Sequence, residues 1–145
     1  MDEQSLETIE IELAVLLRHL SLIATYKKIG NLDRSAYLLL HQIISNGATG
    51  VKTLADELHL DTSTISRQAT VLEQKGYVYR IPDTVDRRAY SLQITDFGVK
   101  EFNEYKQLRL EKVAELLRNW SDKECKVFAK LLKKYNHSLI DILDN

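Results

Sequence analysis

The chain has 145 residues, 44% of them apolar and 28% charged, which suits one compact domain with its own core. Its apolar runs are too short to cross a bilayer, its acidic N-terminus is unlike a secretory signal, and its single cysteine excludes an internal disulfide. The net charge is −1, so binding to a polyanion would depend on how the charges are distributed. We expect a cytoplasmic protein without metal or cofactor, because no cysteine/histidine cluster has zinc-ligand spacing.

Apolar residues recur at helical spacing in the first third of the chain. Over residues 5–28 they follow a period of about 3.6 residues, which predicts one long helix that stops near residues 30–31. Asp33 or Ser35 suits the N-cap of a second helix over residues 34–46. The side chains expected on the inner face of that helix are Tyr37, Leu38, Leu40, Ile43 and Ile44.

Two shorter helices come next. A polar, glycine-containing break ends the second helix, and apolar residues at helical spacing over residues 51–58 predict a third. After a turn, Asp61 or Thr62 is placed to cap a fourth helix that runs to about Lys75. Gly76 suits the left-handed position that often follows a helix end. Two short helices joined by a tight polar turn are typical of a helix-turn-helix.

A hairpin and two long helices complete the chain. Residues 77–81 and 89–94 are rich in aromatic and β-branched side chains, which predicts two strands joined by a loop over residues 82–88. Thr95 is placed to cap a helix that runs to about Trp120.

A capping-box pair, Ser121 and Glu124, then begins a last helix that extends to about Leu143. The predicted order is four helices, two strands and two helices. The expected fold class is therefore mainly α with a small β-wing.

The fourth predicted helix has a polar face that suits DNA. Ile65, Ala69 and Leu72 fall on one stripe of a helical wheel and must face the core. The opposite face carries short or hydrogen-bonding side chains that can approach base edges in a major groove. Serine and threonine are poor helix formers, so their presence on an exposed face favours a functional role. The candidate DNA-contacting residues of this helix are Ser63, Thr64, Ser66, Arg67 and Thr70.

The loop of the predicted hairpin supplies a second candidate contact. Arg87 and Arg88 lie at its tip, and a polyanion gives a simple reason to expose them there. The Asp86 carboxylate is placed to hold one of these arginines extended through a charge-assisted hydrogen bond. An arginine so aimed can enter a narrow minor groove, where the potential is most negative. The alternative is a salt-bridged surface turn, which would contribute little stability.

Five segments carry a resemblance to a known family: residues 54–58, 64–67, 72–80, 83–88 and 92–98. In this order they are similar to the MarR family of winged helix-turn-helix transcriptional regulators, and the likeness covers nearly the whole chain. The resemblance implies one MarR-type domain, with a DNA-binding lobe and an α-helical dimerisation lobe. The implied divisions are a single domain over 1–145, a winged-helix core over 34–98, a helix-turn-helix at about 51–75, a wing at about 77–94, and dimerisation helices in 1–30 and 99–145.

The resemblance also implies a function. Proteins of this family bind a pseudo-palindromic double-stranded DNA operator as homodimers, usually repress transcription, and often release DNA when a small aromatic or phenolic effector binds. By this likeness, residues 62–75 enter the major groove, and Arg88, positioned by Asp86, enters the minor groove. The first and last helices are also more apolar than a winged helix can cover, which favours a dimer. Val85 stands where a basic residue is common in the family, which predicts weaker non-specific affinity and a shallower salt dependence.

Three other interpretations predict different features. A thiol-oxidation-responsive regulator would act through Cys125, in the first turn of the last helix. A winged helix used for protein contacts would need an apolar exposed face on residues 62–75. An enzyme would need a glycine-rich cofactor domain, for which five glycines leave no room. Tyr26, Tyr37 and His41 lie where effector pockets are common in the family, but ordinary packing explains them better.

Overall fold

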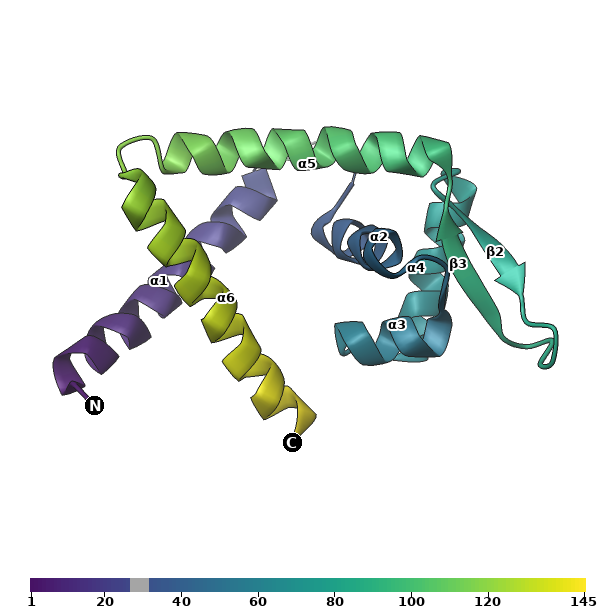
Figure 1. The fold of residues 1–145 in the computed structure, drawn as a ribbon, viewed down its shortest axis with the longest axis horizontal. Coiled ribbons are helices and arrows are strands. Elements are labelled where there is room, and N and C mark those ends of the chain that lie inside the picture. Colours follow the sequence, from purple (N-terminus) through teal and green to yellow (C-terminus); the bar gives the residue numbers. More distant parts are fainter. Residues whose placement is uncertain (27–31) are drawn as a thin grey trace.

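The computed structural model describes residues 1–26 and 32–145, so the expected helix stop at residues 30–31 lies outside the described residues. The secondary structure confirms the expected mainly α fold with a small β-wing. Figure 1 shows the winged hairpin at the opposite end of the molecule from α1 and the start of α6. The elements are α1 (Glu3–Tyr26), α2 (Arg34–Asn46), β1 (Thr49–Gly50), α3 (Val51–Leu58), α4 (Thr62–Gln74), β2 (Val78–Pro82), β3 (Tyr90–Ile94), α5 (Asp96–Leu116) and α6 (Asp122–Asp144).

The sheet has a strand that the sequence analysis did not predict. β1 pairs antiparallel with β3, opposite Leu92 and Ser91, and the strand order is β1-β3-β2. Two residues are too short to show the alternation that identifies a strand, and Thr49 and Gly50 had been assigned to the break after α2. This short strand fixes the start of α3 against the hairpin.

The helix ends follow the expected capping residues in most cases. The Asp33 carboxylate accepts a hydrogen bond from the Ala36 backbone at 2.8 Å, and Ser121 and Glu124 form the expected capping box. The backbone N–H of Ser121 lowers the pKa of the Glu124 carboxyl. Asp61 occupies the N-cap of α4 without a side-chain bond to the helix. α5 ends at Leu116, earlier than expected, and a turn leads from there to α6.

The hydrophobic core lies between the winged hairpin, α2, α3, α4 and the first half of α5. Two expectations for α2 were wrong, because Leu38 and Ile44 are exposed while Leu39 is fully buried. Ile44 lies at the edge of the stripe centred on Leu40 and Ile43, so a small tilt of the helix removes it from the core. At about 100° per residue, Leu38 lies on nearly the opposite side of the helix from that stripe and faces solvent. The buried apolar residues are Leu32, Leu39, Leu40, Ile43, Leu54, Ala55, Ile65, Ala69, Leu72, Tyr77, Val78, Leu92, Phe102 and Tyr105.

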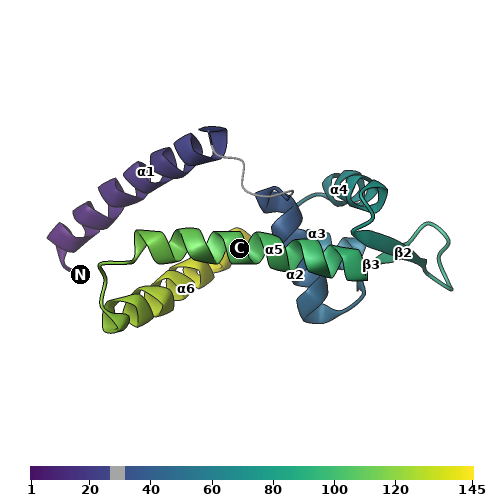
Figure 2. The same cartoon turned by 90° about the horizontal axis from the view of Figure 1, so that it is seen from above.

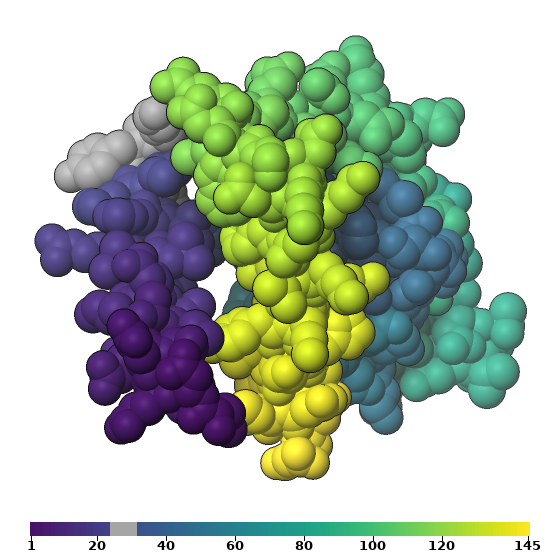
Figure 3. Space-filling view, turned by 60° about the vertical axis from the view of Figure 1, so that its left-hand side comes forward, coloured from purple at the N-terminus to yellow at the C-terminus, as the bar shows by residue number. Residues whose placement is uncertain are grey.

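The terminal helices contribute nothing to this core. None of the described side chains of α1 is buried, and neither is any side chain of α6. Seen from above, α1 stands apart from α5 and α6, and open space is visible beside it in the space-filling view (Figures 2 and 3). Across residues 1–26 and 32–145, no helix combines the length and apolar character that a membrane span requires.

The start of α5 is packed tightly against the beginning of the hairpin. A Cβ atom on Gly98 would lie 2.2 Å from the carbonyl oxygen of Tyr77 and 2.7 Å from Cγ1 of Ile94. We therefore expect Gly98→Ala to lower the free energy of unfolding by about 2–3 kcal/mol, as overpacking does in well-packed interiors. Urea unfolding at one fixed protein concentration measures this change.

Gly50→Ala is the matched control, because nothing lies within 4 Å of a Cβ at that position and its backbone has a negative φ. It should change the free energy of unfolding by less than about 0.5 kcal/mol. Equal stability of the two variants would contradict the close approach of α5 to Tyr77.

Candidate nucleic-acid interface

α3 and α4 form the expected helix-turn-helix. The turn between them depends on His59, whose φ of 55° is left-handed, and whose backbone N–H bonds back to α3. The sequence analysis placed a turn here without identifying this conformation, which is uncommon for a residue other than glycine. The inner stripe of α4 is confirmed, since Ile65, Ala69 and Leu72 are buried against the core. The opposite side of α4 therefore faces away from the core.

The polar face of α4 is open over most of its length. Ser63, Arg67 and Thr70 are exposed, and Thr64 and Ser66 are half-buried. Nη2 of Arg67 donates a hydrogen bond to Oγ1 of Thr64 at 3.2 Å, which holds the guanidinium over the first turn of the helix. Five candidate residues from the sequence thus lie together on one helix face. That face offers hydroxyl groups and one cation to a ligand.

Thr70 already has protein partners for its hydroxyl. It donates to the carbonyl oxygen of Ser66 at 3.0 Å and accepts from Nη2 of Arg80 at 2.9 Å. Arg80, on β2, was not among the candidate residues. The period of two along a strand could have shown that Arg80 points inward. Arg80 is two residues from the buried Val78, so both side chains lie on the same face of the hairpin.

The wing loop is ordered by two aspartates that bond to the backbone. Oδ1 of Asp83 accepts from the backbone N–H of Val85 at 2.8 Å, and Oδ1 of Asp86 accepts from that of Arg88 at 2.9 Å. The expected side-chain contact from Asp86 to Arg87 or Arg88 is therefore corrected to a backbone contact. Short aspartate side chains commonly form such turns, because their oxygens reach a backbone N–H two residues ahead.

Both arginines of the loop are exposed. Among the described residues, no ion pair involves Arg87 or Arg88. The loop is closed at its base by hydrogen bonds between Asp83 and Ala89 and between Ala89 and Asp86. The wing therefore presents two unpaired cations on a short, internally bonded turn.

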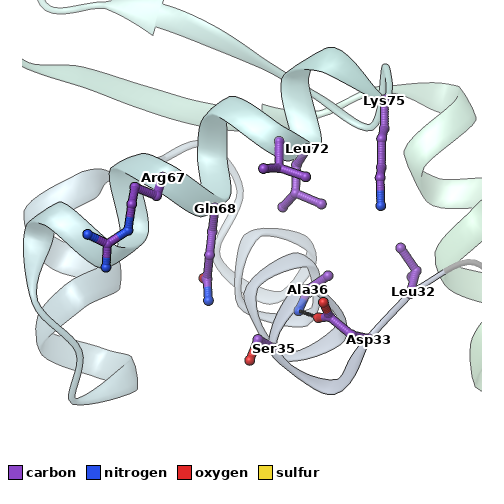
Figure 4. Close-up of a pocket in the computed structure, with 9 residues that line it drawn as sticks. Leu32, Asp33, Ser35, Ala36, Arg67, Gln68, Leu72 and Lys75 are labelled. Carbon is purple, nitrogen blue, oxygen red and sulfur yellow. Dashed lines mark hydrogen bonds between the residues drawn. The ribbon is translucent and has the colours of Figure 1, made fainter.

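A cavity of about 200 Å³ lies between α4 and the start of α2. Gln68, Leu72 and Lys75 extend from α4 toward Asp33 and Leu32 (Figure 4). Its lining combines apolar side chains with the cationic groups of Arg67 and Lys75 and the carboxylate of Asp33. The cavity does not include the site that the sequence analysis weighed for an effector.

Tyr37 and His41, from that other site, belong to an aromatic cluster. Tyr37 contacts Phe102 and Tyr105 edge to face, with ring centroids 4.9 Å apart in both pairs, and His41 lies beside Tyr37. The side chain of Tyr26 lies outside the described residues. Cys125 is half-buried in the first turn of α6. The aromatic cluster joins α2 to α5.

Asp86→Ala should loosen the wing without unfolding the protein. Loss of the carboxylate frees the Arg88 amide, so we expect its NMR order parameter to fall from about 0.85 to below about 0.6. The free energy of unfolding should change by less than about 0.5 kcal/mol, because the loop is exposed. Asp86→Asn keeps an acceptor oxygen and should retain the wild-type order parameter, whereas equal disorder in both variants would refute the backbone contact.

Comparison with known proteins agrees with this geometry. The MarR family model matches residues 32–90. The uncharacterized HTH-type transcriptional regulator YxaD of Bacillus subtilis (strain 168) is 40% identical, over 97% of this chain and 99% of that protein. Among solved structures, a MarR family protein from Bacillus stearothermophilus has a TM-score of 0.75 at 21% identity, covering 97% of this chain and 99% of that chain.

A second solved structure is that of Streptococcus pneumoniae FabT in complex with DNA. It has a TM-score of 0.69 at 19% identity and covers 97% of this chain and 99% of that chain. At such low sequence identity, the structural similarity to these two proteins supports the fold alone. The full-length sequence similarity to YxaD supports the family. The chain belongs to the MarR family of transcriptional regulators.

Proposed function

We propose that the protein is a repressor that binds a pseudo-palindromic DNA operator as a homodimer. The observation that carries the proposal is an exposed polar face on α4 beside a wing whose two arginines have no ion-pair partner among the described residues. In this proposal the winged-helix core over residues 34–98 binds DNA. The helices within residues 1–30 and 99–145 join the two subunits.

α4 is the proposed recognition helix, which enters the major groove. A helix with short hydroxyl side chains can approach base edges closely, and Arg67 can donate two hydrogen bonds to a guanine. Ser63 and Ser66 are on the same face and suit bases or phosphates. The hydrogen bond from Arg67 to Thr64 holds the guanidinium near the N-terminal end of α4, which is the part that reaches base edges in helix-turn-helix proteins.

The wing is the proposed minor-groove contact. Arg88 is the better candidate of the two arginines, because its backbone is held by Asp86 and the entropy lost on binding is therefore smaller. Arg87 suits a neighbouring phosphate. Streptococcus pneumoniae FabT, which has the same fold, has been crystallised with DNA, and this supports a DNA-binding role for the shared architecture.

The homodimer is supported by the apolar surfaces of the terminal helices. Leu17 on α1 is 68% exposed and Ile142 on α6 is 71% exposed, and many apolar neighbours are more than 40% exposed. Monomeric proteins rarely leave such continuous apolar surface in water. A second copy of the chain covers both helices symmetrically and places two wings on one DNA duplex.

A small aromatic or phenolic effector is the proposed signal for release. The cavity between α2 and α4 suits a single-ring molecule, and its lining offers two cationic side chains, Lys75 and Arg67, against the one carboxylate of Asp33, so a phenolate or carboxylate is favoured. A ligand there would contact the recognition helix directly. It would shift the protein away from the DNA-binding conformation if it bound that conformation more weakly.

The operator contact is tested by recovering sheared genomic DNA with the purified protein and sequencing it. We expect enrichment of a short inverted repeat and its loss with Arg88→Ala, which should lower operator affinity by roughly ten- to a hundredfold. The melting temperature should not change, because Arg88 is exposed. A folded dimer that enriches no sequence would refute the proposal in favour of a protein-interaction module.

The dimer is tested with two matched substitutions on α6. Leu131→Asp places a charge on the apolar face and should give a monomer in analytical ultracentrifugation, because burying an unpaired carboxylate is costly. Lys130→Asp makes a charge change on the neighbouring polar face and should remain a dimer. A wild-type protein that sediments as a monomer, or two variants that behave alike, would contradict the proposed interface.

A further inference from the structure

The guanidinium of Arg80 joins three elements of the winged helix. Nη2 donates to Oγ1 of Thr70 on α4 at 2.9 Å, and Nε lies 3.4 Å from Oε1 of Glu73 on the same helix. The guanidinium carbon stands 4.4 Å above the ring centroid of Tyr90 on β3. One side chain from β2 therefore contacts the recognition helix and the other strand of the wing at once.

Arg80 occupies an inward-facing position on the hairpin. It pairs with the fully buried Leu92 across the strands, and Val78, two residues earlier, is buried as well. Beyond this point the residues of β2 and the loop, 81–88, are all exposed. The bonds from Arg80 to α4 therefore lie at the last position along β2 before its exposed end.

Thr70 is committed to this contact. Its hydroxyl hydrogen is donated to the carbonyl oxygen of Ser66, and its lone pair accepts from Arg80. A hydroxyl has one hydrogen, so Thr70 cannot also donate to a base without breaking its bond to the helix backbone. Thr70 therefore suits an anchoring role better than direct contact with a base.

We infer that Arg80 is a positioning residue that sets the angle between the recognition helix and the wing, with Thr70 as its anchor. The inference rests on the proposed function, in which α4 and Arg88 bind the same duplex. The angle between the recognition helix and the wing matters only in that case. Arg80 and Thr70 thereby take a role in DNA binding that involves no contact with DNA.

The geometry explains why the angle would matter. About five residues separate Arg80 from the wing tip, which places the tip roughly 15 Å away at the rise of a β-strand. A tilt of about 10° at Arg80 would then displace the tip by roughly 3 Å, about the length of a hydrogen bond. An arginine displaced this far would lose its place in a groove that is about 6 Å wide.

A phosphate contact is the alternative role for Arg80. The orientation of the side chain argues against it, because the guanidinium faces Thr70 and Tyr90, and 34% of the side chain is exposed. Glu73 also offsets its charge. The two roles predict different behaviour of Arg80→Lys, which keeps the charge but cannot make the planar fork and stack on a ring as arginine does.

The test measures the affinity of four proteins for the DNA recovered by the wild-type protein. The four are the wild type, Arg80→Lys, Arg88→Ala and the double variant, which together form a double-mutant cycle. We expect Arg80→Lys to lower affinity about tenfold with an unchanged salt dependence. In the Arg88→Ala background the same change should have an effect of less than about twofold, because no arginine remains to be positioned. Thr70→Val should match Arg80→Lys and add nothing to it, which also covers the case in which Arg80→Lys folds poorly.

Arg109→Lys is the matched control for the loss of an arginine–ring contact, because Arg109 also stands over a tyrosine ring but lies on α5. Arg109 belongs to the region proposed to join the subunits, so sedimentation is measured first, and a dimeric Arg109→Lys variant should bind the operator as the wild type does. Independent losses from Arg80→Lys and Arg88→Ala would overturn the inference, and so would wild-type affinity of Arg80→Lys. Wild-type affinity of Arg88→Ala would instead refute the proposed wing contact and this inference with it.

Discussion

The junction at Thr95 fixes the relative positions of α4, the wing and α5. Its hydroxyl donates to the carbonyl oxygen of Gly76 at 2.7 Å, its backbone N–H donates to that of Tyr77 at 3.0 Å, and its oxygen accepts from the N–H of Gly98. Thr95 therefore forms hydrogen bonds with the turn that follows α4, with the base of the hairpin and with the first turn of α5. Because Gly98 has no side chain, α5 can approach Tyr77 closely enough for these bonds to form.

This junction makes α5 a rigid connection between the DNA-binding core and the terminal helices. α5 runs from the hairpin along the core and past it, and α6 turns back from its far end (Figure 1). The C-terminal end of α6 returns to the helix-turn-helix, where Nε2 of His59 lies 2.7 Å from Oδ1 of Asp144. The packing of the terminal helices against a partner would therefore determine where each recognition helix stands. Two half-sites of fixed separation require this kind of mechanical continuity.

Local signals predicted most of the fold, and tertiary contacts account for what they missed. The bounds of α2, the caps at Asp33 and Thr95 and the buried stripe of α4 depend on residues close in sequence, so periodicity and capping rules were sufficient. β1 is defined by its pairing with a strand about forty residues away, and that pairing leaves no local pattern. Arg80 was not among the candidate residues, although strand alternation places it on the same face of the hairpin as the buried Val78.

The nearly neutral charge of the chain makes positioning the central requirement for DNA binding. A net charge of −1 gives little long-range attraction to a polyanion, and the exposed wing tip carries Val85 where the family often has a cation. A small number of phosphate contacts would give little affinity from counterion release, and more of the binding free energy would then have to come from groups held in the correct geometry before contact. The hydrogen bonds of Asp83 and Asp86 hold the loop, and the three contacts of Arg80 hold the hairpin that carries it. A wing with few cations can bind selectively if its arginine is already in place when the duplex arrives.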